Sequence, residues 1–257
     1  MTGMVRSLIR VELMLLMRTP VVLFVVVGMP FAVLLLLSLM IGFSFPALEF
    51  GAMPGVRVID RLLAEMAGTV AVAVGIMVCT THVADERACG MLRALRRTPM
   101  RSGSYIAAQA VAATALVVAS MTLFTAATFA IYGPPRSWHP LALTGAALIV
   151  TYCAFSTGLL LGGRRMSPVE ARVMAWCCFL LLFLGSGIGV PREGWKEVAP
   201  WFYEITVYNP LAQLNDFVFH AYLGRLSDTW PAVAGLVVTA LIANIATRRT
   251  FDWAGRS

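Results

Sequence analysis

The side chains that could do chemistry in this chain are few and widely separated. Its one lysine, Lys196, lies between a tryptophan and a glutamate, not in a glycine-rich loop that could hold phosphate. The histidines His82, His139 and His220 show no spacing with other residues that is typical of a metal site or a catalytic triad. The five cysteines form no CxxC pair. The sequence therefore predicts no catalytic residue, no metal site and no cofactor in this chain.

The longest polar stretch between two apolar runs extends from Thr80 to Gln109. Acids open it, arginines follow them, and Pro99 prevents a helix from continuing far beyond them. Four apolar residues within it recur at the spacing of one helix face: Ala88, Met91, Leu92 and Leu95. We expect one short amphipathic helix from Asp85 to Arg97, anchored by its leucines on whatever covers it, either the lipid interface or a partner protein.

The composition identifies the environment in which these residues must lie. The chain of 257 residues is 59% hydrophobic and 13% charged, with a mean hydropathy of +0.81. Soluble domains carry about twice that share of charged residues. We expect a polytopic all-α membrane protein that forms a single domain over residues 1–257, with no soluble domain.

Six apolar runs are long enough to be membrane spans. They cover residues 21–43, 62–82, 105–132, 141–162, 173–190 and 230–246. Gly28 and Pro30 allow a kink in the first span, and the acids Asp60 and Glu65 are expected at the outer end of the second, within reach of water. Residues 1–18 are either an interfacial helix or a plain basic flank.

The basic residues predict the orientation of the spans. Fourteen of the 20 lie in the N-terminal flank, in the loops after the second and fourth spans, and in the tail. The positive-inside rule then places both termini and the polar stretch in the cytosol. The net charge of +7 is explained by this topology, so we expect no nucleic-acid partner.

The segment before the last span is organised like a helix. Asn209 and Pro210 form an N-cap and first-position pair, and Gly224 suits a C-terminal cap. The residues between them that recur at helical spacing are Leu211, Leu214, Val218 and Tyr222. The nearby aromatic residues favour a helical hairpin that enters the outer leaflet, and the alternative is a loop lying on the head groups.

Two pairs of glycines, Gly158 with Gly162 and Gly185 with Gly189, match the spacing that lets helices approach closely. Packing within the bundle or a dimer face would each explain them.

Several of these residues resemble the type-2 permeases of ATP-binding cassette (ABC) exporters. The run Asp85-Glu86-Arg87, followed by Gly90, Leu92, Leu95 and Thr98-Pro99, is similar to the pattern that follows the second span in that family. Tyr208-Asn209-Pro210-Leu211 resembles its Asn-Pro motif, and Arg248-Arg249 with Phe251 and Trp253 resembles its basic-aromatic tail. Ala88-Cys89 departs from the family, where charged residues are common.

The resemblance implies a permease subunit with six spans, an N-terminal interfacial helix, a cytosolic coupling helix and a re-entrant outer hairpin. It implies a homo- or heterodimer in a bacterial inner (plasma) membrane, surrounded by lipid, with two separate ATP-binding subunits that carry ATP and Mg²⁺. It assigns the partner contact to Asp85, Glu86, Arg87, Gly90, Met91, Leu92, Leu95, Thr98 and Pro99. It assigns the outer gate to Tyr208, Asn209 and Pro210.

The expected activity is efflux of a drug-like, lipid or other hydrophobic substrate, as in antibiotic resistance, with ATP hydrolysed outside this chain. An ion-coupled secondary carrier and a non-transporting scaffold remain as alternatives. A mid-membrane acid would favour the carrier, and the span interiors carry no such residue in the sequence reading.

Overall fold

The structure is a computed structural model. It describes residues 2–41, 49–50, 53–97, 102–134, 139–164, 166–186, 196, 199–225 and 230–250. Regular structure within these residues is helical, apart from one antiparallel hairpin of β1 (Glu49–Phe50) and β2 (Met53–Arg57). The all-α expectation is therefore confirmed for the bundle, and the small hairpin was not predicted.

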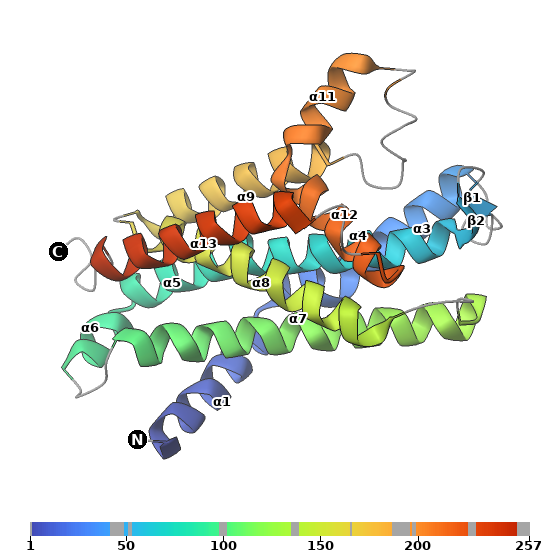
Figure 1. The fold of residues 1–257 in the computed structure, drawn as a ribbon. Helices are drawn as coiled ribbons and strands as arrows, with labels where there is room; N and C mark the ends of the chain where they lie inside the picture. Colours follow the sequence, from blue (N-terminus) through green and yellow to red (C-terminus); the bar gives the residue numbers. More distant parts are fainter. Residues whose placement is uncertain are drawn as a thin grey trace.

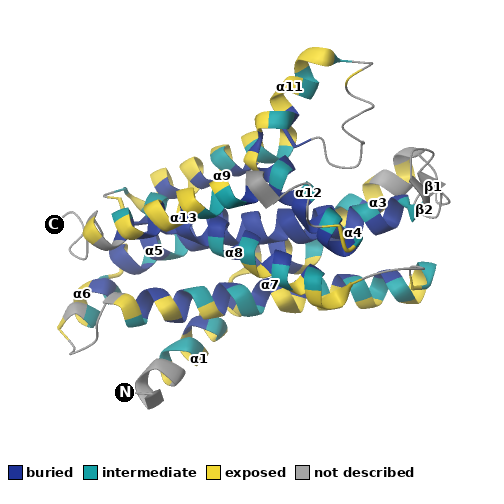
Figure 2. Ribbon diagram, in the orientation of Figure 1, coloured by how far each residue is buried: buried dark blue, intermediate teal, exposed yellow. Residues whose placement is uncertain are grey.

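One continuous helix forms the centre of the bundle. It consists of α4 (Val58–Val72), η3 (Ala73–Val78) and α5 (Cys79–Ala88), and its most apolar stretch is wholly buried. The long helices α7 (Ser102–Tyr132) and α8 (Pro140–Gly162) pack against it, as Figures 1 and 2 show. The surrounding helices turn exposed faces outward, and many of the exposed side chains on them are apolar. Outward apolar faces are what a lipid environment requires.

Among the described residues, three helices are long and apolar enough to cross a membrane: Val58–Ala88, Gly103–Tyr132 and Pro140–Gly162. They contain or closely match the spans expected at 62–82, 105–132 and 141–162. The span expected at 21–43 corresponds to α2 (Pro20–Leu23), η1 (Phe24–Gly28) and α3 (Met29–Ile41). Those expected at 173–190 and 230–246 correspond to α9 (Pro168–Leu184) and α13 (Trp230–Thr250). In the described part of the chain, fewer than the six predicted spans are helices long and apolar enough to cross a membrane. Residues 42–43 and 187–190, at the ends of two predicted spans, lie outside the described part.

The N-terminal segment is the helix α1 (Thr2–Arg18), which crosses beside α7 at one end of the bundle (Figure 1). The helical part of that expectation is confirmed, while its place at the lipid interface stays a prediction. After Thr19 the chain enters α2, and the wide helical turn η1 lies directly before Pro30, where the sequence predicted an irregularity. The start of α1, the end of α13 and the short helix α6 (Met91–Arg96) lie at the same end.

The central helix meets α8 through glycines. A Cβ built on Gly158 would lie 1.8 Å from the carbonyl oxygen of Gly75, and one on Gly162 would lie 3.0 Å from the Cα of Thr80. The Thr80 hydroxyl also donates to the Gly158 carbonyl at 3.1 Å. The Gly158–Gly162 pair therefore serves packing within the bundle. Gly75, its partner in η3, was not singled out from the sequence.

This contact predicts a large effect of a single added side chain. Gly158→Val must push the backbones of η3 and α8 apart, and overpacking of this kind costs about 1–3 kcal/mol or more. We expect the thermal unfolding midpoint of the purified chain in detergent to fall by several degrees. Gly145→Ala is the matched control on the same helix, because a Cβ there would meet nothing within 4 Å. Equal midpoints for the two variants would contradict the packing described.

Candidate functional site

The polar stretch after the central helix forms a corner rather than one helix. The α5 helix ends at Ala88, Cys89 and Gly90 turn the chain, and α6 begins at Met91. Gly90 has a φ of +79°, a left-handed conformation that glycine adopts without strain. The expectation of a continuous helix from Asp85 to Arg97 is therefore wrong. Thr98 and Pro99 lie outside the described residues.

The four apolar residues predicted to share one helix face differ in burial at this corner. Leu92 is fully buried within its own chain, while Met91 and Leu95 are half-buried and Ala88 is exposed. Leu92 thus anchors α6 to the bundle and has no surface left for a partner. We now expect Leu92→Asp to destabilise this chain itself. Arg93 and Arg97 are exposed, so the outward surface of α6 is basic.

Arg87 joins the end of α5 to the end of α8. Its guanidinium donates to the carbonyl of Gly162 at 2.8 Å and to that of Arg164. Carbonyls at a helix C-terminus have no partner in their own helix, so the arginine satisfies groups that burial would otherwise penalise. Arg87 itself is buried. Its neighbour Asp85 forms an exposed ion pair with Arg172 of α9 at 3.1 Å.

Glu86 points inward, to a polar cluster formed by α1, α5 and α7. The Tyr105 hydroxyl donates to Glu86, and Gln109 lies 3.5 Å from that hydroxyl. His82 Nε2 lies 2.7 Å from an oxygen of Glu12 and 3.4 Å from one of Glu86. Burial raises the pKa of the Glu12 carboxyl above its ordinary value, although its hydrogen bond to His82 opposes the rise.

This acid-histidine cluster corrects the sequence reading, which found no such group. His82 and Glu86 are one helical turn apart, and that spacing alone was a signal for a shared face. Glu12 is 70 residues before His82, so only the packing of α1 brings it there. The cluster makes Glu86 an internal residue rather than one that touches a partner.

The acids at the other end of the central helix are also buried, which corrects the expectation that Asp60 and Glu65 reach water. Asp60 pairs with Arg57 at 3.0 Å and accepts from the Tyr222 hydroxyl at 3.2 Å, while Glu65 pairs with Arg61 at 2.8 Å. The hydrogen bond to Asp60 raises the pKa of Arg57. Buried carboxylates held by arginines are structural ion pairs, so they do not favour the carrier alternative.

The segment before α13 is a pair of helices, α11 (Pro200–Tyr208) and α12 (Pro210–Tyr222). Asn209 caps α12 by accepting from the backbone N–H of Leu211 at 2.8 Å, and its amide donates to the Leu182 carbonyl at 2.9 Å. Gly224, with a φ of +73°, follows the end of the helix. The predicted start and end of this helix are confirmed.

The two helices of this pair differ in burial. The residues Leu211, Leu214, Val218 and Tyr222 are all buried, so α12 is packed within the bundle. In contrast, α11 projects away from it, with Trp201 and Tyr208 largely exposed (Figure 2). A segment lying wholly on the surface is therefore excluded for α12.

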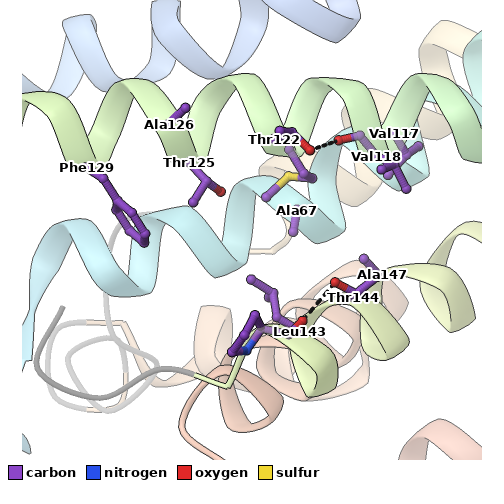
Figure 3. Close-up of a pocket in the computed structure, with 12 residues that line it drawn as sticks. Ala67, Val117, Val118, Thr122, Thr125, Ala126, Phe129, Leu143, Thr144 and Ala147 are labelled. Carbon is purple, nitrogen blue, oxygen red and sulfur yellow. Dashed lines mark hydrogen bonds between the residues drawn. The ribbon is translucent and has the colours of Figure 1, made fainter. Parts of the chain in front are cut away.

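Between the described helices lie two cavities that open to the outside of the bundle and are lined mostly by apolar side chains with a few threonines. The first has a volume of about 420 Å³ and lies between α4, α7 and α8. Its threonines Thr122 and Thr144 donate to carbonyls of their own helices at 2.8 Å, as Figure 3 shows. The second, of about 440 Å³, lies between η3, α8, α9, α12 and α13. Neither is lined by a charged residue among those described.

Together, the long apolar helices and the apolar faces that the bundle turns outward define a polytopic membrane protein. The model of the family described as ABC-2 type transporter matches residues 4–222. The chain belongs to this family, so it is a membrane permease component of an ABC transporter, and the resemblance seen in the motifs is confirmed. No curated protein matches the chain closely enough to add a finer assignment.

Proposed function

We propose that the chain is the permease subunit of an ATP-driven exporter that moves a drug-like, lipid or other hydrophobic substrate out of the cell. The observation that carries the substrate class is the pair of cavities, each larger than 400 Å³ and apolar. Pockets that hold small ligands have volumes of about 300–1,000 Å³. A charged substrate would leave its charge without a partner in such a site.

The proposal includes the arrangement in the membrane. Six spans cross a bacterial inner membrane and place both termini and α6 on its cytosolic side. On the opposite side, α11 and α12 form the re-entrant hairpin at the outer gate. The outward face of α1 carries Val11, Met14 and Met17, each more than 40% exposed, as a helix at the lipid interface would. A second permease chain, identical or different, completes the dimer.

Energy comes from two separate ATP-binding subunits that carry ATP and Mg²⁺. The chain has no phosphate-binding loop, which supports a division of labour between subunits. On the permease side, the exposed Arg93 of α6 and the exposed Arg97 directly after it form the docking surface, with Met91 and Leu95 at its edge. Glu86, Arg87 and Leu92 contribute by holding α6 in position. Asn209 contributes in the same way by holding α12 of the outer hairpin in position.

Narrowing the first cavity tests the substrate path. In inverted membrane vesicles that contain the chain and its ATP-binding subunit, we expect ATP-dependent uptake of a hydrophobic fluorescent compound. Ala126→Phe places a ring at the lining of the cavity and should lower uptake about tenfold, because even one methylene in an apolar pocket changes discrimination about 10-fold or more. Ala107→Phe, exposed on the same helix, is the control. Equal uptake by both variants would contradict a path through this cavity.

A further inference from the structure

The cluster of Glu12, His82 and Glu86 has the composition of a metal site. One ligand atom from each residue can be chosen so that all three lie within 4.8 Å of one another. Glu12 is 0% exposed and Glu86 is 4% exposed. One imidazole nitrogen and two carboxylates are ligands that Zn²⁺ accepts.

Two carboxylate oxygens in this cluster lack hydrogen bonds. Among the residues that the structure describes, neither Oε1 of Glu12 nor Oε1 of Glu86 has a hydrogen-bond partner, and both atoms are buried. Oε1 of Glu86 has an ion-pair contact with His82 at 3.4 Å, so Oε1 of Glu12 is the less satisfied of the two. A buried carboxylate oxygen left in this way carries a large desolvation cost. A cation between the two oxygens and His82 would remove that cost.

The distance between His82 and Glu86 fits an ion coordinated by both. Two ligands that each lie about 2.0–2.1 Å from a tetrahedral Zn²⁺ are about 3.3 Å apart. His82 Nε2 lies 3.4 Å from Oε1 of Glu86, close to that value. It lies 2.7 Å from Oε2 of Glu12, a hydrogen-bond distance, while the buried Oε1 of Glu12 has no hydrogen bond and is the oxygen left for an ion. The Tyr105 hydroxyl donates to the other oxygen of Glu86, Oε2. This bond orients the carboxylate and leaves Oε1 for the ion, as outer partners do in metal sites.

We propose that Glu12, His82 and Glu86 bind one divalent transition-metal ion of the Zn²⁺ class, with water at the fourth position. Two carboxylates and a neutral imidazole balance the charge of such an ion. The ion joins α1 to the cytosolic end of the central helix, one turn before the corner that leads to α6. The site is separate from the two cavities and from the proposed substrate path.

Metal titration of the purified chain in detergent tests the site. The chain carries no polyhistidine tag, and the exposed thiols Cys89 and Cys177 are replaced by serine so that they bind no metal. Co²⁺ is added first and followed by its visible absorption, and Zn²⁺ is then used to displace it. We expect one equivalent of Co²⁺ per chain, displaced by Zn²⁺ and not by Mg²⁺.

Variants locate the bound ion. Glu12→Gln should weaken Co²⁺ binding more than tenfold, and Tyr105→Phe should weaken it about 10- to 100-fold through the lost orienting bond. Glu204→Gln, an exposed acid on α11, should leave it unchanged. The proposal is overturned if the folded chain binds neither Co²⁺ nor Zn²⁺ at micromolar concentration. It is equally overturned if binding survives unchanged in both Glu12→Gln and Glu86→Gln.

Discussion

Arg87→Met should lower the stability of the isolated chain by about 3–6 kcal/mol, because two charge-assisted hydrogen bonds worth about 1.5–3 kcal/mol each are lost together. The methionine fills similar volume but donates to neither the Gly162 nor the Arg164 carbonyl, and the former lies in a buried contact. The end of α8 would then separate from α5. The measurement is thermal unfolding of the purified chain in detergent.

Arg93→Met is the matched control, since Arg93 is exposed on α6 and lies six positions from Arg87. Exposed arginines contribute little to stability, so its unfolding midpoint should stay close to that of the wild type. If Arg87→Met unfolds at the same temperature as Arg93→Met, the guanidinium does not hold the two helix ends together.

Reversing the charge of α6 should break the connection to the ATP-binding subunit without unfolding the permease. Arg93 and Arg97 are exposed, so the double variant Arg93→Glu with Arg97→Glu disturbs no buried contact of its own chain. If the surface of the ATP-binding subunit that contacts α6 is acidic, a change of four charge units converts attraction into repulsion. We then expect at least about tenfold weaker binding of that subunit. Co-purification and ATP-dependent export should fall together.

The control applies the same change of charge to α1, on the side that we propose to be cytosolic. Arg10→Glu with Arg18→Glu alters two exposed residues of α1 and should leave the ATP-binding subunit bound. Equal loss in both double variants would indicate a general effect of charge, and no loss in either would show that α6 is not the docking surface.

The parts of the fold that the sequence predicted are those governed by local patterns. Apolar runs of sufficient length located the long helices, and the Asn209-Pro210 pair marked the start of α12 because capping depends on neighbouring residues only. The spacing of Gly158 and Gly162 identified a close helix contact for the same reason. Each of these signals lies within a few residues of the feature that it predicts.

The errors arose where residues distant in sequence meet. The apolar periodicity around Leu92 was correct as a pattern, but Gly90 turns the chain in the middle of it, and the bundle rather than a partner covers the leucine. Asp60 and Glu65 were placed near water because their arginine partners could not be oriented from the sequence. Glu12 joins His82 only through the packing of α1, which no local pattern encodes.

The central claim is that this chain transports only with a separate ATP-binding subunit. Its most direct test is to purify the tagged chain from its own membranes in mild detergent, identify the bound proteins, and measure ATP hydrolysis with and without them. We expect an ATP-binding subunit in equal amount with the chain, hydrolysis by the complex, and none by the chain alone. Hydrolysis by the chain alone, or export driven by an ion gradient in vesicles without any ATP-binding protein, would contradict the account.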